Sequence, residues 1–424
     1  MKKKLYPTKW SIRLLVWCFL SLFVKWFNIK KHLPNEVKNI QGPYLLLSNH
    51  VGFWDPFLIG HLLPRFTHFV SSDAVFRSPI LRLFLTGLGT IPKKKGIRDT
   101  KVIRDIIGVM RQGEGVGLFP EAVRNWAGKS FPMDPSIVKL IKILKVPVVV
   151  AVMKGMHQFN PRWSRKLRRT KVEVSYKILF TPEQVKELSE EELFEALTQA
   201  IDHDEVAWQQ EHIHPIHSKH KAEEIGHALY VCPECQKLNT FVAKGNDFYC
   251  HSCGYYLHIN TYGFYEVKSS HQLHFDNIRD WYHWQEKWLI NTVSQKFEQD
   301  KNIPLLEEQR LNIYRGEGSE EIKLLGEGTA YLYTDRIEIC LDEDINPIIL
   351  PLDQIQSLSA QLHERLEMYY NDTAYRFVGI NKGVSALKWE VAVNTLWKKM
   401  GQDKKLMAYI PTEILEGEQL LGRE

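Results

Sequence analysis

A histidine and an aspartate five residues apart follow an apolar run in the sequence LLLSNHVGFWDPF, residues 45–57. The leucines predict the end of a buried strand. Asp55-Pro56 predicts a helix start, because Asp is a good N-cap and Pro is tolerated at the first helical position. His50 is therefore expected on a loop between a strand and a helix. Two interpretations are open: a pair for general-base catalysis, or a loop histidine beside an ordinary helix cap.

Two further strand-to-loop junctions carry charged residues. The sequence EGVGLFPEAVRNW, residues 114–126, runs from a predicted strand into a loop with Glu121 and Arg124, and GTIPKKKG, residues 89–96, contains three consecutive lysines. Predicted strands near 43–48, 115–119 and 146–152 alternate with predicted helices at 99–112 and 134–144. This alternation predicts an α/β architecture with the loop residues gathered at one edge of the sheet.

Four blocks of the sequence carry a family resemblance. NHVGFWD resembles the NHxxxxD motif of glycerolipid acyltransferases of the 1-acylglycerol-3-phosphate type. FPEAVRN resembles their FPEGTRS block, GTIPKKK their G-x-I-x-V-x-R block, and VPVVVAV their final Val-Pro-rich strand. The blocks occur in the family's order over roughly residues 35–180, about a third of the chain. Four blocks in order are a far more specific signal than a single His-x4-Asp.

The resemblance implies roles for these residues. His50 would be the general base that deprotonates an acceptor hydroxyl, and Asp55 would accept the other ring N–H and fix the tautomer. Arg124 and Lys95 match family positions that hold the acceptor's phosphate. The second block ends in Lys95 rather than Arg, so the neighbouring Lys93 and Lys94 are alternatives.

The role of Glu121 and three departures from the family's blocks leave the identity of the acceptor undecided. Glu121 matches the family's acidic position and would either bind an acceptor hydroxyl or order the loop. Ala122 replaces the usual Gly, Val123 the usual Thr, and Val150 the family's second Pro. If position 122 requires a positive φ, Ala is disfavoured there, because only Gly lacks the Cβ penalty.

Composition predicts a globular protein with an anionic partner. The chain has 424 residues, 44% hydrophobic and 25% charged, which predicts about two to four domains. Residues 1–180 carry 32 Lys and Arg against 9 Asp and Glu, whereas the remainder carries 23 basic against 41 acidic residues. The basic front half therefore predicts binding to nucleic acid or to an anionic membrane surface.

The N-terminus favours the membrane. LLVWCFLSLFV, residues 14–24, is uncharged and flanked by cations and tryptophans. As a helix it would cover roughly half of a ~30 Å hydrocarbon core, too little for a span. We expect an interfacial helix that makes the protein peripheral or monotopic on the cytoplasmic face of a membrane. A helix docked on the domain's own core is the alternative. The basic segment PRWSRKLRRTK, residues 161–171, predicts a membrane-facing patch or a solvated loop.

Two Cys-x2-Cys pairs separated by fourteen residues occupy residues 232–254. The spacing of Cys232, Cys235, Cys250 and Cys253 predicts a closed, structural zinc site of the ribbon kind. Two disulfides are the alternative, which no secretory context supports. The four histidines of HIHPIHSKH, residues 212–220, are interpreted as part of a polar linker rather than as a metal site.

The other back-half segments predict helices and a β-rich end. Residues 181–205 predict an acidic amphipathic helix, and residues 275–297 an aromatic-rich one. Short strands follow from about residue 321, with a hairpin turn at Asn371-Asp372 and a last helix over 382–400 with one apolar face. This pattern resembles a pleckstrin-homology-like or GRAM-like domain with a regulatory or adaptor role, whose protein partner is unassigned.

The predicted fold class is an α/β acyltransferase domain with an N-terminal interfacial helix, then a small zinc ribbon and an α+β C-terminal domain. The expected segments are 1–32 interfacial helix, 33–205 acyltransferase domain, 206–228 linker, 229–259 zinc ribbon, 260–320 helical connector, 321–402 pleckstrin-homology-like domain and 403–424 tail.

The resemblance implies a membrane-associated O-acyltransferase. The donor would be an acyl-coenzyme A or acyl-carrier-protein thioester, and the acceptor a lysophospholipid, first of all 1-acylglycerol 3-phosphate, which would become phosphatidic acid. One alternative is the same chemistry on a different lysolipid. The other is a zinc-ribbon nucleic-acid-binding protein, which the acidic surroundings of the ribbon disfavour. We expect a structural Zn²⁺ and no nucleic-acid partner.

Overall fold

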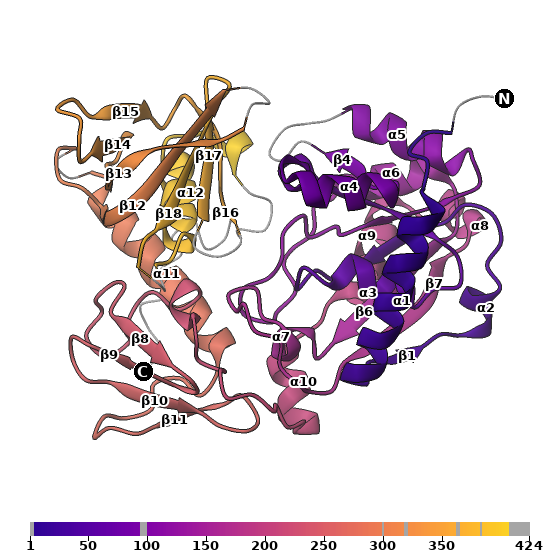
Figure 1. Cartoon of the computed structure of the whole chain (residues 1–424), viewed down its shortest axis with the longest axis horizontal. Coiled ribbons are helices and arrows are strands. Elements are labelled where there is room, and N and C mark those ends of the chain that lie inside the picture. Colours follow the sequence, from indigo (N-terminus) through magenta and orange to yellow (C-terminus); the bar gives the residue numbers. More distant parts are fainter. Residues whose placement is uncertain are drawn as a thin grey trace. The chain divides into compact units, whose positions relative to one another are not determined.

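The computed structural model describes residues 4–93, 100–298, 301–317, 321–361, 365–381 and 384–406. The chain forms two compact units, coloured from indigo to magenta and from magenta to yellow in Figure 1. The first unit runs to Arg162 and continues from Arg168 to His217. The second contains the short segment Trp163–Leu167 and the chain from Ser218 onward.

The first unit is built on a seven-stranded sheet in the order β1-β7-β6-β2-β5-β3-β4. Strands β6, β2, β5, β3 and β4 are parallel, and β7 is antiparallel to β6. The central strands are continuous apolar runs buried on both faces, which is typical of parallel sheets covered by helices. The strands are β1 Lys30–His32, β2 Leu45–Ser48, β3 Thr67–Ser72, β4 Ile91–Lys93, β5 Gly115–Leu118, β6 Val148–Lys154 and β7 Glu173–Phe180.

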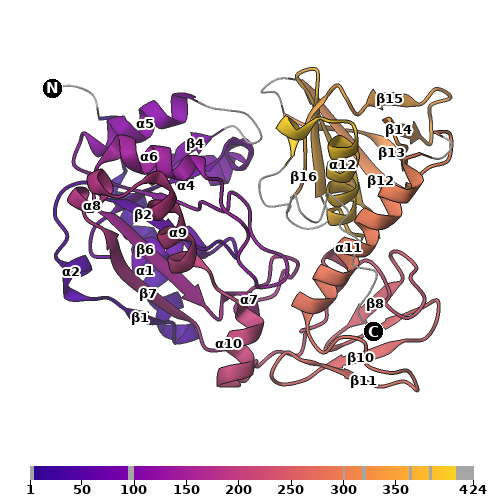
Figure 2. The ribbon, with the colours of Figure 1, turned by 180° about the vertical axis from the view of Figure 1, so that it is seen from behind.

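Helices cover both faces of this sheet (Figures 1 and 2). The main core lies between the sheet and helices α5, α6 and α9, and it contains Leu45, Val116, Val148, Ile106 and Leu197. The helices of the first unit are α1 Trp10–Phe27, α2 Asn35–Lys38, α3 Asp55–His61, α4 Pro79–Gly87, α5 Thr100–Met110, α6 Ser136–Leu144, α7 Met156–Phe159, α8 Pro182–Glu187, α9 Glu190–Ile201 and α10 Glu205–His212. The α/β alternation predicted around β2, β5, β6, α5 and α6 is therefore confirmed.

The acidic segment 181–205 is two helices rather than one. Ser189 interrupts it, because its hydroxyl accepts from the Glu192 N–H and the Glu192 carboxylate accepts from the Ser189 N–H. This reciprocal capping box starts α9, and Thr181 with Gln184 makes the same motif at the start of α8.

Helix α1 is longer than the apolar run that predicts it. It has 18 residues, and by length and composition alone it could cross a membrane. The expectation of a helix too short to span is therefore wrong on length. Only Leu20 and Phe23 are buried in it. Phe23 stacks on Trp54 with ring centroids 4.6 Å apart, whereas Leu22 and Trp26 are 70% and 69% exposed. One narrow face docks on the domain, and most of the apolar surface is exposed.

The second unit contains two antiparallel sheets. The smaller has the order β11-β10-β9-β8, and the larger has the order β15-β14-β13-β12-β18-β17-β16. The strands are β8 Phe241–Lys244, β9 Asp247–Cys250, β10 Tyr256–Ile259, β11 Tyr265–Val267, β12 Leu306–Glu317, β13 Lys323–Leu332, β14 Arg336–Leu341, β15 Ile348–Pro351, β16 Ile355–Ala360, β17 Arg365–Tyr370 and β18 Thr373–Gly379. The predicted β-rich end is confirmed, but it begins with β12, inside the segment expected to be a helical connector.

Helices α11 Ile278–Lys296 and α12 Leu387–Lys399 pack against each other in this unit. Every residue of α12 from Leu387 to Trp397 is buried, so the predicted helix with a single apolar face is wrong in that respect. Its Lys388 forms a buried ion pair with Glu308 of β12. The hairpin turn predicted at Asn371-Asp372 joins β17 to β18, with φ angles of 46° and 61°. Positive φ at both residues is the geometry of a two-residue hairpin turn, which Asn and Asp tolerate.

Candidate active site and metal centre

Strand order brings the predicted chemical groups of the first unit together. Strand β2 lies between β6 and β5, and all three are parallel. The loops after their carboxyl ends therefore meet at one edge of the sheet, where α/β proteins bind ligands. His50 follows β2, and Glu121 and Arg124 follow β5. The expected gathering of loop residues at one sheet edge is confirmed for these three.

His50 and Asp55 form a close pair. Nδ1 of His50 lies 2.8 Å from Oδ2 of Asp55. The same oxygen accepts the backbone N–H groups of Val51 at 2.6 Å and Gly52 at 2.9 Å. Asp55 is the first residue of α3, and Trp54 is the N-cap, so the expected capping role is wrong. The carboxylate turns back onto the loop and fixes the backbone beside His50.

Hydrogen bonding determines which nitrogen of His50 is available. A carboxylate only accepts, so Nδ1 carries the proton and Nε2 presents a lone pair. Asp55 is fully buried, whereas the His50 side chain is 19% exposed. Burial lowers the pKa of His50 below its ordinary 6.5, against the opposing effect of Asp55, and the cations Arg124 and Arg162 lower it further. A neutral imidazole at neutral pH can act as a general base.

The backbone of His50 is clamped by the loop after β5. Oε1 of Glu121 accepts the His50 N–H at 3.0 Å, and its Oε2 accepts the N–H of Phe131 at 3.0 Å. Asn125 donates to the His50 carbonyl from its backbone N–H at 3.0 Å and from Nδ2 at 3.2 Å. Burial raises the pKa of Glu121 to about 8, and the two backbone donors act in the opposite direction. Both oxygens of Glu121 therefore hold loop backbone.

The ring of His50 is supported on one face. It stacks on Phe119 with centroids 4.0 Å apart and planes 18° apart. Phe119 is the first residue after β5, so the strand end itself positions this ring. Together with Asp55 and the backbone clamp, this contact restricts the imidazole to one orientation.

Arg124 lies near His50 and Asp55, on the loop after β5. Burial and, after it, the charge of Arg162 lower the pKa of Arg124 to about 9, while Asp55 acts in the opposite direction. Lys93 is the exposed last residue of β4. Lys94 and Lys95 fall outside the described residues. The structure thus brings Arg124, of the expected phosphate ligands, to the histidine.

Ala122 has the backbone conformation that usually favours glycine. Its φ is +60°, in the left-handed region. The Ala122 N–H donates to the carbonyl of Phe119, and the next N–H, that of Val123, donates to the carbonyl of Glu121. This tight turn brings the Glu121 carboxylate back toward His50, so the conditional expectation of a positive φ at position 122 is met.

The basic segment 161–171 is not one exposed patch. Arg162 and Arg168 are each only 4% exposed, whereas Arg165 and Arg169 are exposed. Arg162 stacks over Trp126, with the guanidinium carbon 3.9 Å from the ring centroid. The segment also divides between the two units. A continuous membrane-facing patch is therefore wrong for the two buried arginines.

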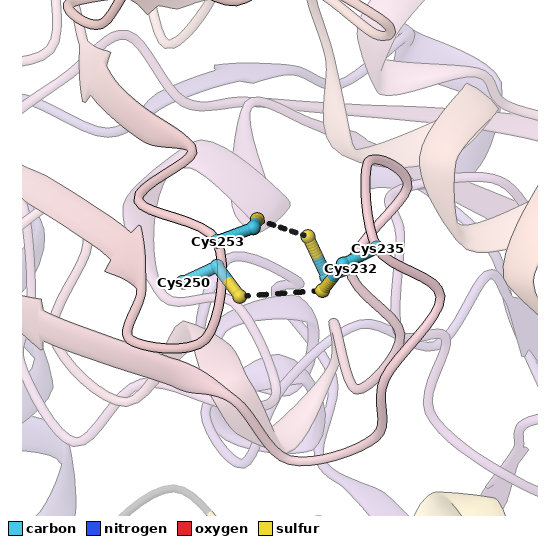
Figure 3. A group of neighbouring side chains, drawn as sticks. All are labelled: Cys232, Cys235, Cys250 and Cys253. Carbon is cyan, nitrogen blue, oxygen red and sulfur yellow. Dashed lines mark hydrogen bonds between the residues drawn. The ribbon is translucent and has the colours of Figure 1, made fainter.

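Four thiols converge in the second unit (Figure 3). The Sγ atoms of Cys232 and Cys253 are 3.7 Å apart, as are those of Cys235 and Cys250, and all four lie within 4.8 Å of one another. Zn–S bonds of about 2.3 Å in a tetrahedron place sulfurs roughly 3.8 Å apart. A disulfide needs about 2.05 Å, and all four thiols are free, which contradicts the disulfide alternative. Among the residues described, this is the one group with metal-ligating geometry; the histidines of 212–220 form none.

Sequence patterns alone missed two residues of the clamp. Asn49 bonds both backbone groups of Met153 on β6, through Oδ1 and Nδ2, at 2.9 Å each. Asn125 holds the His50 carbonyl as described above. Both side chains are buried; Asn49 is the first residue of the NHVGFWD block and Asn125 the last residue of the FPEAVRN block. A buried Asn needs hydrogen-bond partners, which is the signal that identifies both.

Comparison with known proteins agrees with this geometry. Residues 28–154 match the family model described as Acyltransferase. The 1-acyl-sn-glycerol-3-phosphate acyltransferase of Bacillus subtilis (strain 168) is 25% identical over 133 residues, which are 31% of this chain and 63% of that protein. The chain therefore spans less than two thirds of the length of this relative.

Two solved structures share weaker likenesses. The crystal structure of the 1-acyl-sn-glycerophosphate (LPA) acyltransferase PlsC from Thermotoga maritima is 19% identical with a TM-score of 0.38, over 44% of this chain and 75% of that chain. The Vps36 N-terminal PH domain is 18% identical with a TM-score of 0.19, over 23% and 82%. On the family match and the sequence relative, residues 28–154 are similar to acyltransferases of the 1-acylglycerol-3-phosphate type.

Proposed function

We propose that this protein is an O-acyltransferase that moves an acyl chain from a thioester donor to the free hydroxyl of a lysophospholipid. The leading acceptor is 1-acylglycerol 3-phosphate, and the product is then phosphatidic acid. The observation that carries this proposal is the His50–Asp55 pair, with Nδ1 and Oδ2 2.8 Å apart, inside the acyltransferase-family domain.

In the proposed mechanism, Nε2 of His50 takes the proton of the acceptor hydroxyl as its oxygen attacks the thioester carbonyl. The C–O bond forms, the C–S bond breaks, and the imidazolium returns its proton to the leaving thiolate. Asp55 stabilises the imidazolium and keeps the tautomer with Nδ1 protonated. Glu121 and Asn125 hold the histidine in place through its backbone, so we assign Glu121 to loop ordering rather than to hydroxyl binding.

The acceptor's phosphate is assigned to Arg124. A guanidinium can hold a phosphate through two parallel N–H bonds, which a lysine cannot do. Lys95 keeps its expected role as a second phosphate ligand, with Lys93 and Lys94 as alternatives. A different lysolipid acceptor is the rival proposal, since Ala122, Val123 and Val150 depart from the family's blocks.

Membrane association is proposed through α1. Trp10, Leu22 and Trp26 of this helix are each about 70% exposed or more, which is costly in water and favourable at a bilayer surface. A peripheral or monotopic protein on the cytoplasmic face would place the donor thioester and the acceptor headgroup on the same side. The proposed catalytic domain is residues 33–205, with α1 as its membrane contact.

The cysteine cluster is proposed to bind a structural Zn²⁺. Cys232, Cys235, Cys250 and Cys253 would fill all four positions of the ion, which supplies a cross-link and leaves no open position for chemistry. The seven-stranded sheet that follows, with α12 behind it, supports a pleckstrin-homology-like or GRAM-like domain that begins at β12 rather than at residue 321. A regulatory or adaptor role is proposed for it.

The decisive test offers the purified chain a panel of lysolipids with acyl-coenzyme A and acyl-carrier-protein donors, with products read by mass spectrometry. We expect acylated 1-acylglycerol 3-phosphate from the wild type and none from His50→Ala. His61→Ala, on α3 and outside the clamp, is the matched control and should retain turnover. No acyl product with any donor, or normal turnover by His50→Ala, would contradict the proposal.

A further inference from the structure

A second arginine stands beside the proposed phosphate site, and no block of the family resemblance contains it. Arg162 follows β6 and α7, and β6 is the strand next to β2 on the side opposite β5. The loop with His50 therefore lies between the loop with Arg124 and the loop with Arg162. The strand order thus brings the loops with Arg124 and Arg162 to the same sheet edge as the loop with His50.

Arg162 is buried at this edge of the sheet and held by fixed contacts, unlike a surface charge. Its side chain is 96% buried, and its guanidinium lies flat on the indole of Trp126 at 3.9 Å. Its Nη1 donates to the backbone carbonyl of Arg124. Stacking on an aromatic face and a bond to backbone fix the plane of the guanidinium, as preorganised anion sites require.

Two guanidiniums held together discriminate between anions by charge. The Arg124 carbonyl that accepts from Arg162 belongs to the residue before Asn125, and Asn125 donates to the His50 carbonyl, so both arginines border the same site. Like charges in a partly buried site repel, and a ligand that carries two negative charges offsets both. A phosphomonoester is close to a dianion at neutral pH, because its second pKa is about 6, whereas a phosphodiester keeps one negative charge.

We infer that Arg162 is a second phosphate-binding residue, which makes the site selective for a lysolipid with a terminal phosphomonoester over one with a phosphodiester headgroup. This inference rests on the proposed acyl transfer and deepens it, since it names the residue that sets the acceptor class. It also gives Arg162 a function in place of the exposed basic patch.

The test compares two soluble short-chain acceptors, a 1-acylglycerol 3-phosphate and its methyl phosphodiester, by kcat/KM with a single donor. For Arg162→Gln we expect the kcat/KM of the monoester to fall about 10–100-fold, mainly through KM, because a charge-assisted contact is lost. The kcat/KM of the diester should change less than threefold, so the preference of the wild type for the monoester should collapse. Arg162→Lys should recover the preference only in part, since it restores charge without the planar fork.

Arg168 provides the matched control. It is equally buried in the same segment, and its backbone N–H donates to the Phe159 carbonyl at 2.8 Å. Arg168→Lys should leave the ratio of kcat/KM for the monoester to kcat/KM for the diester unchanged. This control separates a binding role of Arg162 from general damage to the loop. A ratio in Arg162→Gln and Arg162→Lys equal to that of the wild type overturns the inference while turnover stands. Failure of the wild type to acylate either acceptor overturns the proposed function instead.

Discussion

Replacing Asp55 by Asn isolates the electrostatic part of the proposed mechanism. Asn keeps the size of the side chain and an oxygen that can accept from Val51 and Gly52, but it removes the charge 2.8 Å from Nδ1 of His50. In the ground state the imidazole is neutral, so removing the Asp55 charge costs it little electrostatic stabilisation. In the transition state it becomes an imidazolium, and the lost attraction then raises the barrier.

The magnitude follows from the distance. Coulomb's law at 2.8 Å gives about 6 kcal/mol for a full charge at an effective dielectric constant of about 20. Proton transfer is incomplete in the transition state, so about half to all of this energy is lost. We therefore expect kcat to fall about 10²–10⁴-fold. The free energy of unfolding should change by only about 1–2 kcal/mol, because the acceptor oxygen for the two backbone N–H groups remains.

Release of coenzyme A thiol, followed with a thiol reagent, measures kcat, and urea unfolding measures stability. Asp134→Asn is the matched control, because Asp134 also accepts a backbone N–H, that of Ser136, away from the site. In a His50→Ala background, Asp55→Asn should have no further effect on the residual rate. Turnover of Asp55→Asn within a factor of three of the wild type, or additive losses in the double variant, would refute the acid–base pair.

Three further predictions follow from the same geometry. Because burial lowers the pKa of His50, kcat/KM should fall with acidification only below pH 6.5, as protonation removes the base. A midpoint at or above 6.5 in the pH–rate profile contradicts the assignment. Ala122→Gly should stabilise the chain by up to about 1.6 kcal/mol, since relief of a positive φ, worth about 1–2 kcal/mol, outweighs the added unfolded-state entropy of about 0.4–1 kcal/mol. Urea unfolding that shows a loss of stability contradicts the turn assignment. The chain purified under reducing conditions should contain one equivalent of zinc. Replacing Cys232 and Cys235 by Ser should release the zinc and make residues 225–265 accessible to protease. Elemental analysis that finds no metal in the intact chain refutes the zinc proposal.

Short-range patterns determined the parts of this protein whose partners are close in sequence. His50 and Asp55 lie on one loop, so the pair that the family resemblance implies depends on no long-range partner. The two Cys-x2-Cys turns predict one four-thiol cluster, and Asn371-Asp372 predicts one tight hairpin, for the same reason. The apolar runs of β2, β5 and β6 predict a buried parallel sheet, because strands covered on both faces need no polar alternation.

Only the tertiary structure decided questions that depend on long-range partners. Glu121 was open between hydroxyl binding and loop ordering until both its oxygens were seen on the N–H groups of His50 and Phe131. Arg162 and Arg169 look alike in the basic segment, yet one is buried on Trp126 and the other is exposed. Burial and pairing of this kind depend on which strands are neighbours in the sheet, and strand order is a property of the whole fold that local composition does not contain.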